Sequence, residues 1–254
     1  MADPGLKGKN AVVTGGGSGI GRSTALQMAE GGARVLVADL DADAARGVAE
    51  EVRAAGGTAE TVVGDLSRQD VVDEVVATAT DRLGGIDVLV NNAGIMDDMS
   101  ATADVTDEVW ERLIRVNLTA PFLLTRAVLP HMVGRGAGSI VFTVSEASLR
   151  GGASGAAYTA SKHGVAGLVK STAIMYRDQG VRVNAVAPGG TATGISVDLD
   201  PEAHGPAVMG RYAANMGRVA QPEEPAAAIV FLASDAASNI NGVILPVDNG
   251  WAAV

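Results

Sequence analysis

Tyr158 and Lys162 are the two residues of the chain whose types and spacing most directly suggest chemistry. They lie four positions apart in the segment SGAAYTASKHGVAG, residues 154–167, so a helix would place them on one face. An ammonium beside a phenol favours the phenolate and lowers the tyrosine pKa from its ordinary value of about 10. Because this spacing is also common on solvated helix faces, the pair predicts acid–base chemistry only if other parts of the chain support it.

A glycine-rich turn near the beginning of the chain is the first such support. The segment TGGGSGIG, residues 14–21, lies between an expected strand, NAVVTG, and an expected helix, GRSTALQMAEGG. Glycines at this place permit a tight turn and a close approach of a pyrophosphate, whose oxygens the free N–H groups of the helix can bind. The position between strand and helix favours this interpretation over a merely flexible turn. The predicted contacts are Gly15, Ser18, Gly19, Ile20 and Gly21.

An acidic residue ends the second expected strand, RVLVADL. A carboxylate at Asp39 can accept hydrogen bonds from both adenosine ribose hydroxyls, and it would repel a 2′-phosphate. The sequence therefore predicts NAD as the cofactor, with NADP disfavoured. Asp39 could also cap the following helix.

Further polar or small residues follow the third and fourth expected strands. Asp65 could take the adenine amino group and Leu66 could cover the ring, while Asn92, Ala93 and Gly94 would let the cofactor lie against backbone. The carboxyl ends of parallel strands meet at one edge of a sheet, which is where such sheets bind ligands. This shared placement is what links the segments to one site.

The elements that must position these residues alternate along the chain. Short β-rich runs are separated by Ala-rich helical stretches, and 47% of the 254 residues are hydrophobic, enough for one substantial core. The pattern predicts an α/β Rossmann fold over 1–254, a doubly wound parallel sheet of about seven strands with helices on both faces. A helical region is expected over 106–133, which Pro121 and Pro130 could bend or divide.

Residues 190–218 form the one long irregular stretch, between a strand and the last helix. An insertion of this length is typical of a lid over a site. Its expected lining residues are Ile195, Leu199, Met209, Tyr212 and Met216.

Charge and composition exclude several function classes. The chain has 19 basic and 29 acidic residues and a net charge of −10, which argues against nucleic acid or an anionic membrane as partner. It contains no cysteine, and His131, His163 and His204 lack ligand spacing, so we expect no metal site. No signal peptide and no apolar run of membrane-spanning length is evident, so the protein is expected to be cytoplasmic.

Taken in order, the motifs resemble those of one family, the short-chain dehydrogenases/reductases. They are AVVTGGGSGIG, NNAG, RVNLTAPF, YTASK, NAVAPGG and VILPVDNG, and they cover nearly the whole chain. The resemblance implies an NAD(P)-dependent enzyme that interconverts a secondary alcohol and a ketone by hydride transfer, assembled as a homotetramer. It also implies four catalytic residues, Asn117, Ser145, Tyr158 and Lys162.

The resemblance gives each residue a role. Tyr158 would act as general acid or base, Ser145 would hold the substrate oxygen, and Lys162 would tune the phenol and hold the nicotinamide ribose. Asn117 would hold a water connected to the lysine. The segment PGGTAT is similar to the family's nicotinamide-binding segment, which adds Pro188, Gly189, Thr191 and Thr193 as cofactor contacts.

Two other functions remain open at this stage. A 3-oxoacyl-[acyl-carrier-protein] reductase is disfavoured, because such enzymes usually take NADPH and an acidic carrier protein matches a chain of net charge −10 poorly. A non-catalytic NAD-binding sensor on the same fold is opposed by the intact set of four catalytic residues.

Several other residues carry open interpretations. Glu146 is expected to be a solvated loop charge that can pair with Arg150, or alternatively to contact a polar substrate. Asp97 and Asp98 are expected in a solvated loop rather than in a cation site. Trp110 and Trp251 are expected in packing or subunit contacts.

Overall fold

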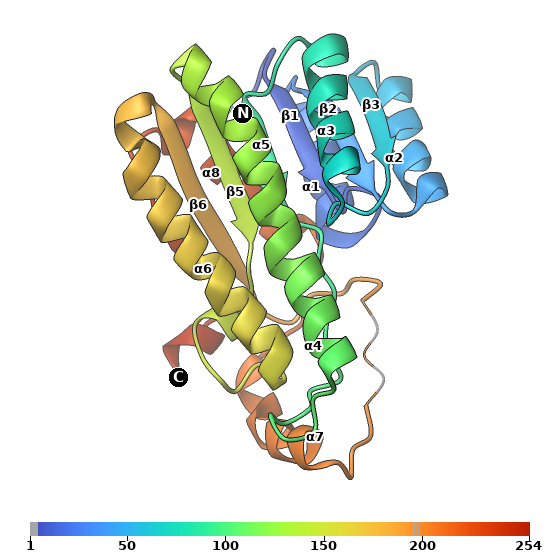
Figure 1. The fold of residues 1–254 in the computed structure, drawn as a ribbon, viewed down its shortest axis with the longest axis vertical. Coiled ribbons are helices and arrows are strands. Elements are labelled where there is room, and N and C mark those ends of the chain that lie inside the picture. Colours follow the sequence, from blue (N-terminus) through green and yellow to red (C-terminus); the bar gives the residue numbers. More distant parts are fainter. Residues whose placement is uncertain (1–4, 196, 198) are drawn as a thin grey trace.

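The computed structural model describes residues 5–195, 197 and 199–254, and Figure 1 shows the arrangement of its elements. Within this part of the chain seven parallel strands form one sheet in the order β3-β2-β1-β4-β5-β6-β7. The strands are β1 (Asn10–Thr14), β2 (Arg34–Asp39), β3 (Thr58–Val63), β4 (Val88–Asn91), β5 (Gly138–Thr143), β6 (Val181–Pro188) and β7 (Ile244–Val247). The predicted doubly wound sheet is confirmed. Residues 1–4 of the expected domain lie outside the described part.

Helices cover both faces of the sheet because alternate strand residues point to opposite sides. The principal helices are α1 (Gly19–Glu30), α2 (Ala42–Ala54), α3 (Gln69–Thr78), α4 (Asp107–Ile114), α5 (Ala120–Arg135), α6 (Ala156–Tyr176), α7 (His204–Met209) and α8 (Glu223–Ala233). Side chains of α3, α5 and α6 pack on one face with Val12, Leu89 and Ile140. Those of α1, α2 and α8 pack on the other with Val13 and Val90.

The expected helical region over 106–133 is interrupted. Thr106 caps α4 by accepting a hydrogen bond from the Val109 N–H, and a five-residue π-helical turn, η2 (Arg115–Thr119), separates α4 from α5. Pro121 lies in the first turn of α5, where a missing N–H costs nothing. The region is therefore divided by a π turn, a feature common at functional sites, and not at a proline.

The insertion over 190–218 contains more regular structure than expected. It includes α7 and a 3-10 helix, η5 (Gly210–Met216), while residues 196 and 198 lie outside the described part. A Cβ at Gly205 would lie 2.1 Å from the Met99 carbonyl oxygen, so α7 packs directly on the segment that follows β4. Figure 1 shows α7 beyond the carboxyl ends of the strands, as a lid requires.

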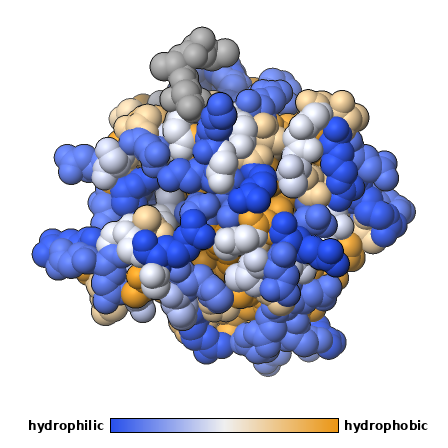
Figure 2. Space-filling model, turned by 90° about the horizontal axis from the view of Figure 1, so that it is seen from above, coloured by the Kyte–Doolittle hydropathy of each residue, from blue (hydrophilic) through white to orange (hydrophobic). Residues whose placement is uncertain are grey.

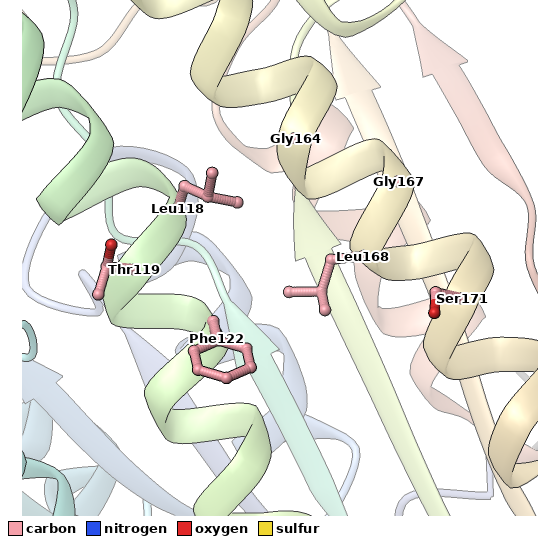
Figure 3. A pocket seen from close by; sticks show the side chains of 7 residues that line it. All are labelled: Leu118, Thr119, Phe122, Gly164, Gly167, Leu168 and Ser171. Carbon is pink, nitrogen blue, oxygen red and sulfur yellow. The ribbon is translucent and has the colours of Figure 1, made fainter.

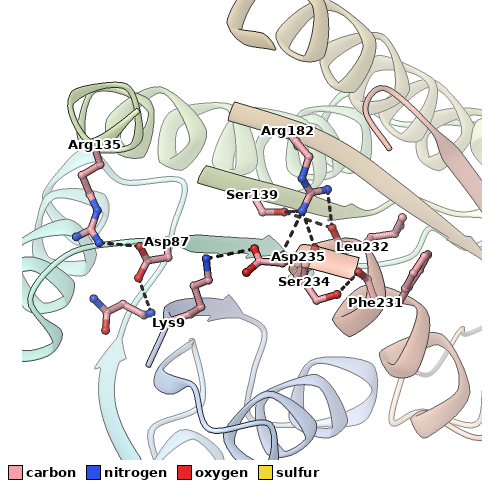
Figure 4. Close-up of polar contacts among 11 residues, drawn as sticks. Lys9, Asp87, Arg135, Ser139, Arg182, Phe231, Leu232, Ser234 and Asp235 are labelled. Carbon is pink, nitrogen blue, oxygen red and sulfur yellow. Dashed lines mark hydrogen bonds and ion pairs between the residues drawn. The ribbon is translucent and has the colours of Figure 1, made fainter. Parts of the chain in front are cut away.

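The opposite edge of the sheet is closed by polar contacts. The Arg182 guanidinium donates to the carbonyl oxygens of Leu232 at 2.9 Å and Ser234 at 3.0 Å, and Asp87 pairs with Arg135 at 2.8 Å (Figure 4). Hydrophilic side chains cover most of the face seen in Figure 2, which views the molecule from this end. Because these cations and acids already contact one another or backbone, this edge serves the architecture.

Asp97 fixes the beginning of α6. Its carboxylate is 4% exposed and accepts hydrogen bonds from the Ser154 hydroxyl at 3.0 Å, the Gly155 N–H at 3.2 Å and the Tyr158 N–H at 2.9 Å. The expectation that Asp97 lies in a solvated loop is therefore wrong, because free N–H groups at a helix start attract a carboxylate. Its neighbour Asp98 is exposed, as expected.

No helix in the described residues combines the length and the apolar character needed to cross a membrane.

Because Asp97 accepts hydrogen bonds at the beginning of α6, replacing it by alanine would leave buried donors there without an acceptor. The substitution should lower the free energy of unfolding by about 2–3 kcal/mol. Asp98→Ala is the matched control, with an expected change within about 0.5 kcal/mol. Urea unfolding followed by circular dichroism measures both. Equal effects of the two substitutions would show that Asp97 does not anchor α6.

Candidate functional site

The glycine-rich turn between β1 and α1 has no room for side chains. A Cβ at Gly21 would lie 2.0 Å from the Gly15 carbonyl oxygen, and one at Gly15 would lie 2.9 Å from the Ala93 Cα. Gly15 and Gly19 also have positive φ angles of 60° and 49°, which favour glycine. Ser18, the N-cap of α1, is exposed and makes no side-chain cap hydrogen bond, and the first turn carries no acid. The free N–H groups at this helix start, with Ile20 in the first turn, fit a dinucleotide pyrophosphate.

Asp39 ends β2 beside this turn. Its carboxylate accepts hydrogen bonds from the Gly17 N–H at 2.8 Å and the Asp41 N–H at 3.0 Å. Asp41, not Asp39, caps α2, since it accepts from the N–H groups of Asp43 and Ala44. The carboxylate of Asp39 therefore lies at the edge of the glycine turn with remaining acceptor capacity toward a ribose.

The segment after β4 is tied to the glycine turn through Thr14. The Thr14 hydroxyl accepts hydrogen bonds from the N–H groups of Asn92 at 2.9 Å and Ala93 at 3.0 Å, and the Asn92 amide donates to the Thr14 carbonyl at 3.1 Å. A Cβ at Gly94 would lie 3.2 Å from Asn117 Oδ1 and 3.4 Å from Lys162 Nζ. Gly94 thus brings the cofactor-side backbone directly against two predicted catalytic residues.

Asp65 and Leu66 are half-buried and follow the end of β3. The Asp65 carboxylate accepts a hydrogen bond from the Ser67 N–H at 2.9 Å, and its hydrogen bonds with Ser67 hold its pKa below the ordinary value. The neighbouring Gly64 N–H donates to the Asp39 carbonyl at 3.0 Å, which links the two strand ends. This segment lies at the same sheet edge as the rest of the predicted cofactor contacts.

The segment after β6 returns to the glycine turn. Pro188 ends the strand, and the Gly189 N–H donates to the Val247 carbonyl at 3.1 Å. Thr191 pairs with Ala220 in an isolated bridge. The Thr193 methyl lies 3.0 Å from where a Cβ of Gly19 would be, so the predicted nicotinamide-binding segment lies over the start of α1.

Ser145, Tyr158 and Lys162 meet at the carboxyl end of β5. The Ser145 hydroxyl faces the Tyr158 phenol and lowers its pKa, and the Lys162 Nζ lies 5.5 Å from the centroid of the phenol ring. The ammonium donates to the Thr143 carbonyl at 3.1 Å, and the tyrosine and lysine side chains are both buried. The helical spacing seen in the sequence therefore places phenol and ammonium on one inward face.

Asn117 joins them from the π turn η2. Its amide donates to the Ile95 carbonyl at 2.8 Å and to the Ser161 hydroxyl at 3.2 Å, and its Oδ1 accepts from the Ile95 N–H at 2.9 Å. The four predicted catalytic residues are thus brought to one place. The π turn that turns Asn117 inward is not visible in the sequence pattern.

Burial controls the protonation of this group. The pKa of Tyr158 is raised to about 12. Burial is the main cause of this rise, the Ser145 hydroxyl opposes it, and the charge of Asp97 adds to it. Burial also lowers the pKa of Lys162 to about 8. In the protein without cofactor, desolvation of the phenolate therefore makes the phenol less acidic than an ordinary tyrosine. The prediction that Lys162 and the oxidised nicotinamide together lower the phenol pKa concerns the protein with bound cofactor and stays a prediction.

Glu146 differs from its expected setting. Its Oε2 lies 3.0 Å from Arg150 Nε, which confirms the predicted pair, but the residue is completely buried and not a solvated loop charge. A side chain without accessible surface cannot touch a substrate in this arrangement. Of the two tryptophans, Trp251 is buried and Trp110 is 44% exposed.

Three residues build the site in roles that the sequence pattern does not reveal. Thr14 joins two cofactor segments, Asp97 anchors the helix of Tyr158, and Asp248 lies beside Glu146. Asp248 could have been noticed as an acid directly after a strand, where carboxylates often accept backbone N–H groups. Among the described residues no three potential metal ligands cluster.

Comparison with known proteins agrees with this geometry. The pattern of the short chain dehydrogenase family matches residues 9–204. The chain is 43% identical over 253 residues to 3beta-hydroxysteroid dehydrogenase 2 of Eggerthella lenta, covering 99% of this chain and 97% of that protein. It is 42% identical over 246 residues to cis-4-hydroxycyclohexanecarboxylate dehydrogenase of Sinomonas cyclohexanicum, covering 96% of each.

Two solved structures show which cofactors such folds hold. A putative NAD(P) dependent gluconate 5-dehydrogenase from Beutenbergia cavernae, with bound NADP, superposes with a TM-score of 0.87 at 40% identity and full coverage of both chains (100% each). A 3-ketoacyl-(acyl-carrier-protein) reductase from Brucella melitensis, complexed with NADH, gives 0.86 at 33% identity, covering 97% of this chain and 99% of that one. With the sheet order, the glycine turn and the Ser-Tyr-Lys group, these matches show that the chain belongs to the short-chain dehydrogenase/reductase family, whose members are oxidoreductases that use a nicotinamide cofactor.

Proposed function

We propose that the protein is an NAD(H)-dependent oxidoreductase that interconverts a secondary alcohol and a ketone, with Tyr158 as general acid and base. The observation that carries this proposal is that the Ser145 hydroxyl faces the Tyr158 phenol, with Lys162 on the same helix face and the glycine turn beside them. One substrate carbonyl oxygen could then meet both a proton donor, Tyr158, and a second hydroxyl, that of Ser145.

The residues divide the work by position. The N–H groups at the start of α1 would hold the pyrophosphate, Asp39 the adenosine ribose, and the 188–193 segment the nicotinamide, whose chemistry when bound is to exchange a hydride with the substrate carbon. Ser145 donates a hydrogen bond to the substrate oxygen, and Tyr158 gives that oxygen a proton in reduction or removes it in oxidation. Because the phenol pKa is about 12 in the protein alone, proton removal depends on positive charge near it. Lys162 supplies one such charge, and an oxidised nicotinamide would add a second.

Asp39 supports NAD as the preferred cofactor. A 2′-phosphate would face its carboxylate, and the basic residue in the neighbouring helix, Arg22, is paired with Glu51 at 2.6 Å. Asp39 would therefore repel the 2′-phosphate, and Arg22 is not free to bind it.

A ring alcohol or ketone is the proposed substrate class. The two relatives above are named for a hydroxyl on a steroid and on a cyclohexane ring. The 190–218 segment exposes the apolar side chains of Ile195, Leu199 and Tyr212, which suits an alicyclic substrate body. A 3-oxoacyl-carrier-protein reductase is the second candidate, favoured by the Brucella structure with NADH and opposed by the net charge of −10.

A homotetramer is the proposed assembly, with the outer faces of α5 and α6 as one contact. A depression of about 420 Å³ lies between them, lined by Leu118, Thr119, Phe122, Gly164, Gly167, Leu168 and Ser171 (Figure 3). Phe122 is 42% exposed there, and small residues on α6 leave space for a facing helix.

Tyr158→Phe should lower kcat by about 10²–10⁴-fold for a ring alcohol with NAD, because the proton carrier is lost. NADH affinity, measured by fluorescence titration, should fall far less than turnover. Tyr176→Phe, on the same helix, is the control and should keep wild-type kcat. Unchanged turnover in the Tyr158 variant would favour the NAD-sensor alternative or another proton carrier.

Asp39→Ser should shift the ratio of kcat/KM for NADP to that for NAD by about 10–100-fold toward NADP, because a like charge facing the 2′-phosphate is removed. The same assay applied to Asp43→Ser, an exposed acid on α2, should show no shift in this ratio. A wild-type enzyme that already prefers NADP would refute the cofactor assignment.

Gly167→Arg should reduce the mass of the assembly in size-exclusion chromatography with light scattering. A Cβ at Gly167 meets nothing within 4 Å in the protomer, so only a partner should be disturbed. Gly47→Arg on α2 is equally open and serves as control. If both variants keep the wild-type mass, this face is not a subunit contact.

A further inference from the structure

The turn that carries Ser145 also holds an acid that no solvent reaches. Glu146 is 0% exposed, and neither of its carboxyl oxygens accepts a hydrogen bond from the described residues. Arg150 Nε lies 3.0 Å from Oε2, but its geometry gives an ion pair without a hydrogen bond. A buried carboxylate without donors is expensive, so this arrangement requires a source of hydrogen bonding.

A second carboxyl faces the first. Burial raises the pKa of Glu146 to about 7, and Asp248, which lies beside it just after β7, contributes to this rise against the lowering effect of Arg150. Asp248 itself accepts hydrogen bonds from the Gly250 N–H at 3.0 Å and the Ala252 N–H at 2.5 Å. Two carboxylates cannot donate to each other, whereas one shared proton supplies the missing donor.

This contact joins three segments around the site. The Asp248 Cα lies 3.0 Å from where a Cβ of Gly189 would be, so Asp248 lies against the 188–193 segment. Arg150 Nη1 donates to the Val254 carbonyl at 2.7 Å, which ties the Ser145 turn to the residues after β7 a second time. Movement of Glu146 away from Asp248 would therefore loosen both the Ser145 turn and the nicotinamide segment.

We propose that Glu146 and Asp248 share one proton, and that this carboxyl pair is a positioning device that holds the Ser145 turn against the 188–193 segment. Its effect on catalysis rests on the proposed function. Glu146 is then a positioning residue, acting through Ser145 and not on the substrate. Loss of the proton leaves two facing carboxylates and the single cation of Arg150, so the contact weakens as pH rises.

The stability of the protein tests the shared proton directly. The pKa of Glu146 is raised on folding from about 4.5 to about 7, so the protonated pair is fully stabilising below about 4.5 and this contribution is lost as pH rises through about 7. Glu146→Gln keeps the shape, supplies an amide donor to Asp248 and does not titrate. The Tm of this variant minus that of wild type should increase by roughly 3 °C or more between pH 5 and pH 8. A difference that stays constant with pH would overturn the shared proton.

Two further variants make the comparison specific. Glu50→Gln, an exposed acid on α2, should follow wild type at both pH values. Asp248→Asn removes the other carboxyl of the pair, so its Tm relative to wild type should show the same pH dependence as that of Glu146→Gln. This variant serves as the test if Glu146→Gln does not fold. In wild-type protein labelled with 13C at glutamate carboxyls, one resonance should titrate near pH 7. If every glutamate titrates below about pH 5.5, the proposed pair is contradicted.

Activity separates positioning from simple stability. In wild type, log kcat/KM for the ring alcohol should bend near pH 7, and Glu146→Gln should lack this bend while keeping the NADH affinity of wild type. An identical bend in both proteins would contradict the positioning role. If wild type turns over no alcohol or ketone, the proposed function fails, while the Tm comparison and the carboxyl titration still decide whether the proton is shared.

Discussion

A parallel sheet brings the carboxyl ends of all its strands to one edge, and every functional assignment depends on this constraint. Thr14, Asp39 and Asn92 are far apart in the sequence, yet hydrogen bonds join the glycine turn to the residues after β2 and β4. The opposite edge is closed by Arg182 and by the pair of Asp87 and Arg135. The two edges therefore differ: polar contacts within the protein close much of one, while the other presents helix N–H groups and hydroxyls.

The site also depends on glycines, which let backbone segments approach one another more closely than any side chain would allow. At Gly21 a methyl group would overlap the Gly15 carbonyl, and at Gly205 it would overlap the Met99 carbonyl. The first contact shapes the cofactor turn and the second brings α7 onto the segment after β4. Because Gly94 separates Asn117 and Lys162 from the cofactor side by a bare backbone, the reacting groups can lie close to a bound nicotinamide.

Burial favours the neutral form of each titratable group that it gathers. It disfavours the phenolate of Tyr158 and the ammonium of Lys162, and it favours the neutral form of Glu146. The site therefore depends on partners for each charge: backbone N–H groups for Asp97, a carbonyl for Lys162 and the Arg150 guanidinium for Glu146. This explains why polar residues without direct chemical roles surround the tyrosine.

The sequence by itself determined the fold class, because the alternation of strands and helices and the motif order have few physical solutions. It also determined the residue types of the site, since glycine spacing and the Tyr158–Lys162 spacing are local properties of a turn and a helix. Only the tertiary structure decided what is buried. Asp97 and Glu146 read as loop charges in the sequence, the π turn at Asn117 has no local signature, and the rise in the phenol pKa on burial is not visible in the Tyr158–Lys162 spacing. Desolvation is the reason in the charged cases, because it depends on atoms brought in from distant segments and not on neighbours along the chain.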